Sequence, residues 1–323
     1  MIAHQDGLHL ATAPHSLAPM TADRPLLGIT LMLGFCLVAP MGDSIAKLLG
    51  GVIPLGELLT VRFVLQALLL LPLIGSSRRT LYMTPRLYRL TAIRTALHML
   101  GIAAMFLSLQ YLPLADAVAI AFVMPFIMLL LGKYYLNEEV GIRRLAACAV
   151  GFIGTMLVVQ PSFAAVGAPA LLPLVVAVTF AFFMLVTRKL AKATDPVSLQ
   201  AVSGIMASII LVPLLFVGEF LDLPGFNPVV PKLYDWLLLL ALGTLGTMAH
   251  LLMTWSLRFA PAATLAPMQY LEIPFATVIG WLVFRDFPNG LALIGIAITM
   301  AAGLYIIYRE RALSRLPVPA SPP

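Results

Sequence analysis

Ten runs of apolar residues, each about 20 residues long, follow one another along most of this 323-residue chain. A run of this length crosses the roughly 30 Å of bilayer hydrocarbon as one α-helix. Only 11% of the residues are charged and 61% are hydrophobic, which excludes a water-soluble fold. The runs cover residues 26–48, 55–74, 88–110, 113–135, 141–160, 170–190, 197–217, 234–257, 261–284 and 288–308. The sequence therefore predicts an all-α integral membrane protein with ten transmembrane helices.

A motif in the first half of the chain recurs in the second half. Residues 108–113 (SLQYLP) match residues 256–261 (SLRFAP), and Pro125 falls within one residue of Pro274 at the same offset. Five spans in each half mean that the second half enters the membrane upside down, which is the inverted repeat typical of secondary transporters. The expected division is a disordered tail at 1–25, five-helix repeats at 26–160 and 170–308, and a second tail at 309–323.

The distribution of basic residues predicts the orientation in the membrane. Most of the 20 Lys and Arg residues fall in segments on the same side as the N-terminus, whereas Lys47, Lys232 and Arg285 fall on the other side. Because basic loops stay in the cytoplasm, both termini are expected to be cytoplasmic in a multi-pass protein of the inner (plasma) membrane. The membrane also explains the net charge of +6 without a nucleic-acid partner.

The arrangement of spans, prolines and acidic residues resembles the EamA family of the drug/metabolite transporter superfamily over about residues 26–308. A proline opens the fourth and ninth spans, and Glu138 with Glu139, or Asp286, follows each of them. That family typically has Glu at this spot, so Asp286 is a departure. The resemblance implies ten spans in two inverted fives and a transport function, but the family moves amino acids, nucleosides, vitamins and other metabolites.

Two segments are similar to particular bacterial members of that family. Residues 42–47 (GDSIAK) and the run from Leu114 to Gly132 resemble members linked to riboflavin or S-adenosylmethionine. This resemblance implies a vitamin such as riboflavin as the favoured substrate, ahead of S-adenosylmethionine and amino acids.

Glu272 is the clearest ionisable residue near the middle of a span. It lies about 16 Å along the ninth span and just before Pro274. A charge at this depth costs several kcal/mol unless it has a partner or a role. Glu272 is therefore expected either to contact a substrate ammonium or carry a coupled proton, or to form a buried ion pair with Arg62 or Arg94.

Three other charged side chains lie toward the outer ends of the first two spans. Asp43 precedes Lys47 by four residues, so it forms either a helical ion pair or a substrate contact. Glu57 and Arg62 are interpreted as an outer salt bridge or gate. Arg94 is expected to snorkel to the inner surface.

Histidine, amide and aromatic side chains complete the expected site. His98 and His250 are interpreted as interhelical hydrogen-bond donors or as proton relays. Trp255, Gln269 and Tyr270 flank His250 and Glu272 in sequence and are expected to bind the substrate. Further aromatic residues and methionines supply candidate walls for a pocket: Phe106, Tyr111, Phe122, Phe126, Phe180, Trp281, Met124, Met184, Met253 and Met268.

The inventory of motifs favours a carrier over an enzyme. The sequence contains no HExxH, GxSxG, GxxxxGK[ST] or CxxC motif, so no cofactor, metal site or nucleotide site is expected. Pro125 and Pro274 fall at about midplane depth, where kinks serve as hinges. We expect a secondary transporter that moves a small polar or amphipathic metabolite by alternating access, as a monomer or homodimer. The less favoured alternatives are a non-transporting receptor and an intramembrane enzyme.

Overall fold

The computed structural model describes residues 24–77, 79–135, 137, 140–158, 167–285 and 290–314. These residues form α-helices and one short 3-10 helix, with no strand among them, which confirms the expected all-α fold. The elements are α1 (Pro25–Leu49), α2 (Leu55–Ser76), α3 (Pro85–Leu109), α4 (Leu114–Ala121), α5 (Met124–Tyr135), α6 (Ile142–Val158), η1 (Ala168–Leu171), α8 (Leu172–Ala193), α9 (Pro196–Phe220), α10 (Leu233–Phe259), α11 (Ala262–Gln269), α12 (Glu272–Phe284) and α13 (Gly290–Ser314).

Seven helical segments of the described residues are long and apolar enough to cross a membrane, by length and composition. They are α1, α2, α3, α4 with α5, η1 with α8, α9 and α10. Large apolar side chains such as Leu69, Ile209 and Phe216 are exposed on their outer faces. An apolar surface of this extent suits lipid rather than water.

Local signals in the sequence fix where several helices begin. Pro25, Pro85 and Pro196 are the first residues of α1, α3 and α9, where a proline removes no intrahelical hydrogen bond. The Asp195 carboxylate accepts a hydrogen bond from the Ser198 backbone N–H at 3.0 Å and so caps α9.

The fourth and ninth predicted spans are broken helices. The first break is at Phe122, between α4 and α5, and the second is at Tyr270, between α11 and α12. Pro125 and Pro274 lie in the first turn after each break. The kinks expected at the prolines therefore occur a few residues earlier, because a proline ring clashes with the carbonyl four residues before it.

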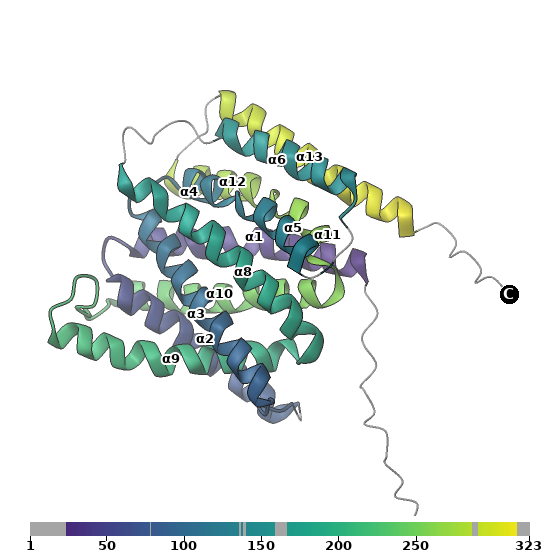
Figure 1. The fold of residues 1–323 in the computed structure, drawn as a ribbon. Coiled ribbons are helices and arrows are strands. Elements are labelled where there is room, and N and C mark those ends of the chain that lie inside the picture. Colours follow the sequence, from purple (N-terminus) through teal and green to yellow (C-terminus); the bar gives the residue numbers. More distant parts are fainter. Residues whose placement is uncertain are drawn as a thin grey trace, which may run out of the picture.

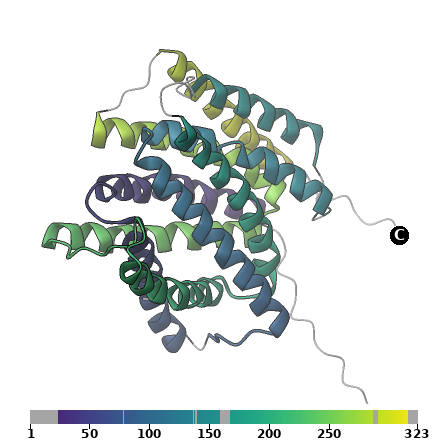
Figure 2. The ribbon, with the colours of Figure 1, turned by 60° about the vertical axis from the view of Figure 1, so that its left-hand side comes forward.

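The helices pack in pairs that join the two halves of the chain (Figures 1 and 2). α1 packs on α10, α2 on α9, α3 on α8, and α6 on α13 at one edge of the molecule. The α1–α10 pair is close because Gly28 faces Ala260, and the Ser256 hydroxyl donates to the Gly28 carbonyl at 2.7 Å. Each half therefore completes the core of the other.

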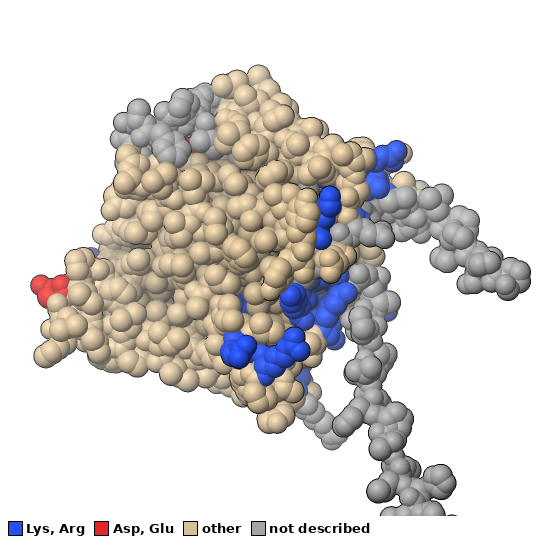
Figure 3. Space-filling view, viewed as in Figure 1, with Lys and Arg blue, Asp and Glu red and all other residues tan. Residues whose placement is uncertain are grey.

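Basic side chains gather at one end of the molecule, where α1 begins and α13 ends (Figure 3). We call this the basic end; Arg24 precedes α1 there, and Lys192 and Arg258 lie in the last turns of α8 and α10. Hydrogen bonds tie these ends together, from the Arg24 N–H to the Phe259 carbonyl at 2.6 Å and from Arg258 Nη1 to the Thr194 carbonyl at 2.9 Å. The start of α1 and the end of α8 therefore lie at the same end of the molecule. α8 is the first helix after residue 168 that is long enough to span a membrane.

Candidate functional site

A cavity of about 70 Å³ lies between the two halves, and we call it the central cavity. Its lining comes from α1, α3, α4, α5, α8, α10 and α12. The lining residues are Phe35, Ala39, Asp43, Ile102, Met105, Val118, Ala121, Phe122, Met124, Val176, Phe180, His250 and Glu272. In the conformation described, a cavity of this size has room for several water molecules.

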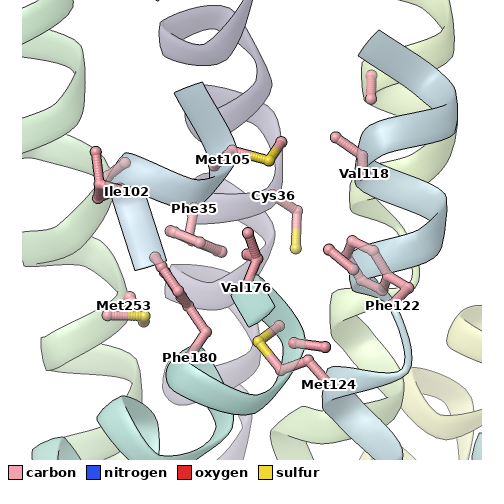
Figure 4. Close-up of a cluster of buried hydrophobic side chains, with 14 of the residues drawn as sticks. Phe35, Cys36, Ile102, Met105, Val118, Phe122, Met124, Val176, Phe180 and Met253 are labelled. Carbon is pink, nitrogen blue, oxygen red and sulfur yellow. The ribbon is translucent and has the colours of Figure 1, made fainter. Parts of the chain in front are cut away.

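The walls of the central cavity are largely apolar (Figure 4). Phe35 of α1 and Phe180 of α8 lie on one side, and Val118 and Phe122 of the α4 segment lie across from them. These rings offer flat faces for stacking, and Met105 offers a polarisable side chain that adapts to a ligand. Among the residues that line this cavity, only Asp43 and Glu272 are carboxylates.

A second cavity, of about 30 Å³, shares part of its lining with the first, and we call it the side cavity. The two cavities share Ala39, Asp43, Ile102 and His250 in their linings. Arg62 lines the side cavity and does not line the central one. Together the linings of the two cavities contain two carboxylates and a guanidinium, and Asp43 and Arg62 both line the side cavity.

Neither cavity carboxylate has a hydrogen bond or ion pair with the described residues. Asp43 does not pair with Lys47, whose Nζ donates to the Leu112 carbonyl at 2.9 Å. Glu272, the first residue of α12, is 7% exposed and pairs with neither of the two arginines considered above. Two unpaired carboxylates in an apolar cavity favour a cationic ligand group or bound protons.

Arg62 is buried on α2, where its hydrogen-bond partners are neutral and the Asp43 carboxylate lines the same side cavity. Its Nη1 donates to Gln66 Oε1 at 3.3 Å, and its Nη2 lies 3.4 Å from the Gly246 carbonyl and 3.0 Å from His250 Nδ1. Glu57 lies elsewhere, where Oε2 accepts the Val229 backbone N–H at 2.9 Å. The salt bridge considered for Glu57 and Arg62 is therefore not formed.

Arg94 does not snorkel to the surface, contrary to the sequence-based expectation. It is fully buried on α3, where Nε donates to Thr187 Oγ1 at 2.8 Å and Nη1 donates to Ser203 Oγ at 2.7 Å. Its guanidinium also lies 4.5 Å from the centre of the Phe183 ring. Arg94 is buried because α8 and α9 cover it. Its position along α3 was not enough to predict this.

His98 and His250 form a buried pair with ring centres 4.2 Å apart. His98 stacks on Phe183, and neither of its ring nitrogens has a hydrogen-bond partner among the described residues. His250 Nδ1 lies 3.0 Å from Arg62 Nη2, which can only donate, and 2.8 Å from the Gly246 carbonyl, which can only accept, so Nδ1 can serve one of these two contacts at a time. Among the described residues, His98 donates no hydrogen bond to another helix.

Two glutamines extend the polar network and were not singled out from the sequence. Gln66 Nε2 donates to the Gln200 carbonyl at 2.8 Å, and Gln200 Nε2 donates to the His250 carbonyl at 2.8 Å and to Thr254 Oγ1 at 3.1 Å. Both amide side chains lie within apolar spans, where a polar residue indicates a contact between helices as clearly as an isolated charge does. They link α2, α9 and α10 at the level of Arg62.

Gln269, Tyr270 and Trp255 do not line either cavity. Gln269 Nε2 lies 3.0 Å from Met184 Sδ, and the Tyr270 ring packs against Phe122 and against α6 at Gly151. Trp255 packs in a separate cluster of α2 and α9 residues that includes Leu70, Ile74, Val197 and Ala201. Glu138, Glu139 and Asp286 lie outside the described residues.

A comparison with protein families matches residues 26–160 and 168–309 to the EamA-like transporter family. The chain belongs to this family. It is therefore a multi-pass membrane transporter with two EamA repeats, and the family resemblance inferred from the prolines and the repeat is confirmed.

Curated relatives of this EamA chain are named for different solutes. The S-adenosylmethionine uptake transporter of Rickettsia bellii is 25% identical, with 88% of this chain and 94% of the relative covered. The riboflavin transporter of Rhizobium johnstonii is 31% identical, with 69% and 72% covered. The pseudopaline exporter CntI of Pseudomonas aeruginosa is 26% identical, with 69% and 74% covered.

One solved crystal structure shares the fold of this EamA chain. Its TM-score is 0.64 at 18% identity, and the match covers 90% of this chain and 98% of that chain. At this identity the similarity concerns the fold alone.

Proposed function

We propose that this EamA chain is a secondary carrier with alternating access, built from ten spans in two inverted five-helix repeats at 26–160 and 170–308. The observation that carries the proposal is a central cavity lined by elements of both halves, with two unpaired carboxylates in an apolar wall. A site between repeats, next to broken helices, is the arrangement that alternating access uses. The carrier lies in the inner membrane, and the basic end with both termini faces the cytoplasm.

Asp43 and Glu272 are the proposed substrate-binding residues in the conformation described. His98, Gln269 and Tyr270 are buried with polar atoms that lack a partner among the described residues, so we assign their contacts, together with those of Trp255, to the inward-facing state. Arg62 and Glu57 act as gating residues, since Glu57 ties the start of α2 to the connection between α9 and α10. Pro125 and Pro274 are the hinges.

The proposed substrate is a small, flat, polar metabolite. Riboflavin is one candidate because the cavity offers aromatic faces and because a relative is named a riboflavin transporter. S-adenosylmethionine is the second candidate, favoured by the two carboxylates, since this solute carries cationic groups. Amino acids share the ammonium and carboxylate groups of S-adenosylmethionine and lack its flat group.

Counterflow in proteoliposomes tests the carrier proposal. Proteoliposomes that contain the protein and are preloaded with unlabelled riboflavin or S-adenosylmethionine are expected to take up the labelled solute transiently and saturably. The double variant Asp43→Asn with Glu272→Gln is expected to lose this activity, whereas Glu219→Gln, an exposed carboxylate outside both cavities, is expected to keep it. Conversion of the solute without counterflow contradicts the proposal in favour of an enzyme.

A further inference from the structure

Arg62 and Asp43 face the same small cavity and do not pair. Arg62 on α2 and Asp43 on α1 both line the side cavity of about 30 Å³, which has room for about one or two water molecules. Of the two cavity carboxylates, only Asp43 lines this space. No ion pair joins Arg62 to Asp43 in the part of the chain that the structure describes. Because opposite charges attract strongly where water is scarce, other contacts hold Arg62 short of Asp43.

The contacts that hold Arg62 are all with neutral acceptors. Its Nη1 donates to Gln66 Oε1 at 3.3 Å. Its Nη2 lies 3.4 Å from the Gly246 carbonyl and 3.0 Å from His250 Nδ1, which accepts only when it is not donating to that same carbonyl. A carboxylate accepts two N–H groups of a guanidinium at once and binds it more strongly. Arg62 is therefore held loosely, beside a stronger partner.

A buried chain of amides fixes the acceptor on Gln66. Gln66 and Gln200 are both 0% exposed. Gln66 Nε2 donates to the Gln200 carbonyl at 2.8 Å, so the amide nitrogen of Gln66 is turned to α9 and its oxygen to Arg62. Gln200 Nε2 donates in turn to the His250 carbonyl at 2.8 Å. The anchor of Arg62 thus belongs to α2, α9 and α10, whereas Asp43 belongs to α1.

Gly246 gives the guanidinium its place against α10. A methyl group at this position would lie 3.0 Å from both Nε and Nη2 of Arg62, closer than such atoms normally pack. Gly246 also lines the side cavity, together with Asp43. A guanidinium displaced from Gly246 therefore has this cavity to move into.

We infer that Arg62 changes partner when the carrier changes state: it leaves Gln66, crosses the side cavity and pairs with Asp43. Asp43 also lines the central cavity, so the new ion pair withdraws a carboxylate from a bound solute and favours its release. Gln66 and Gly246 are the positioning residues of this exchange. The inference rests on the proposed function and assigns Arg62 its partner as a gating residue.

Two cysteine reporters measure the change of state in purified protein in detergent, without any solute. In a background with Cys36 and Cys148 replaced by Ala, Ile102→Cys reports on the cavities. Leu265→Cys, in α11 near the basic end, reports on opening at that end. The ratio of the two rates of modification by a thiol reagent, Ile102→Cys over Leu265→Cys, follows the balance between the states.

Variants on the two sides of Arg62 are expected to move this ratio in opposite directions. Gly246→Ala pushes Arg62 toward Asp43 and is expected to lower the ratio about threefold, whereas Asp43→Asn removes the new partner and is expected to raise it about threefold. Gly246→Ala added to Asp43→Asn is expected to have almost no effect, because the destination of Arg62 is gone. Gly280→Ala is the control, since the added methyl group meets nothing within 4 Å among the described residues, and it is expected to keep the parent ratio.

If Gly246→Ala does not fold, Gln66→Leu takes its place, because it removes the anchor and is expected to lower the ratio as well. A ratio that these variants do not lower, or that Asp43→Asn does not raise, overturns the inference. A full effect of Gly246→Ala in the absence of Asp43 also overturns it. Absence of counterflow for riboflavin and S-adenosylmethionine, with a ratio that responds as expected, contradicts the carrier proposal and leaves the partner exchange in place, so the two failures are distinct.

Discussion

At the scale of single residues, the feature with the clearest energetic consequence is the burial of Arg94. Arg94 is held by two hydroxyls and a phenyl ring, and no ion pair of Arg94 exists among the described residues. Thr187 already donates its own hydroxyl proton to the Phe183 carbonyl at 2.6 Å. Because burying a charge without a counterion costs free energy, such a residue adds little to stability and is retained for another reason.

Arg94→Met is expected to leave the apparent melting temperature in detergent unchanged or slightly raised, because an apolar side chain of similar length removes the desolvation cost and still fills the space. Arg94→Ala is expected to lower it by several degrees, since it leaves a cavity. Thermal melts of both variants in the same detergent provide the measurement. An equal fall in both variants contradicts the argument from desolvation.

Glu272→Gln tests proton coupling at the site. A neutral amide of the same shape cannot bind and release a proton, so we expect facilitated exchange to continue while accumulation against a gradient disappears. Uptake into proteoliposomes with and without an imposed pH gradient measures the difference. Accumulation with an unchanged pH dependence in this variant shows that Glu272 does not couple protons.

At the scale of helices, the breaks at Phe122 and Tyr270 bring side chains of two short helices to the central cavity. Met124 is the first residue of α5 and Glu272 is the first residue of α12, and both line the cavity. In a continuous helix each residue would lie 1.5 Å further along the axis, and every backbone N–H group at the level of the cavity would be hydrogen-bonded within the helix. The breaks place the N-termini of α5 and α12 next to the central cavity and provide points about which these helices can bend.

Pro125→Ala and Pro274→Ala are expected to reduce the counterflow rate, each by about threefold to tenfold, and the double variant by more. Restoring an N–H donor in the first turn after each break favours a straighter helix and slows the change of state. Initial rates in proteoliposomes, with the Kd of the substrate measured alongside, separate slower movement from weaker binding. Full activity of both single variants and of the double variant leaves the prolines no hinge role.

At the scale of the whole molecule, several residues that line the cavities lie beyond the helix midpoints as seen from the basic end, whereas Phe35 and His250 lie on the basic-end side of the midpoints of α1 and α10. Asp43 is in the second half of α1, Ile102 and Met105 are in the last third of α3, and Val176 is near the start of α8. Toward the basic end the same helices are closed by buried side chains such as Leu257. This asymmetry is typical of an outward-facing carrier if the basic end is cytoplasmic.

Labelling with a membrane-impermeant thiol reagent tests that orientation in spheroplasts. In a background with Cys36 and Cys148 replaced by Ala, Ile102→Cys is expected to react, because Ile102 lines both cavities. Leu265→Cys is expected to stay unmodified, because Leu265 is fully buried in α11 near the basic end. Modification of Leu265→Cys with protection of Ile102→Cys contradicts the outward-facing assignment.

The amino-acid sequence by itself was enough to predict the helical membrane fold, the family and the general course of the helices. Hydropathy and proline positions are local properties of the chain. Because a segment that crosses the bilayer forms a helix about as long as the bilayer is thick, these local properties predict where the helices begin and end. Asp43 and Glu272 were found in the same way, since a charge deep in an apolar run stands out without knowledge of its neighbours.

Only the tertiary structure decided which polar groups meet. Trp255 follows His250 closely in sequence yet packs with α2 and α9, whereas Phe180, some 90 residues from Glu272, shares its cavity. Arg94 is buried because α8 and α9 cover it, and Arg62 meets His250 because α2 lies against α10. The rotation of each helix about its axis is set by packing against helices distant in the chain, and in a uniformly apolar span no local pattern records that rotation.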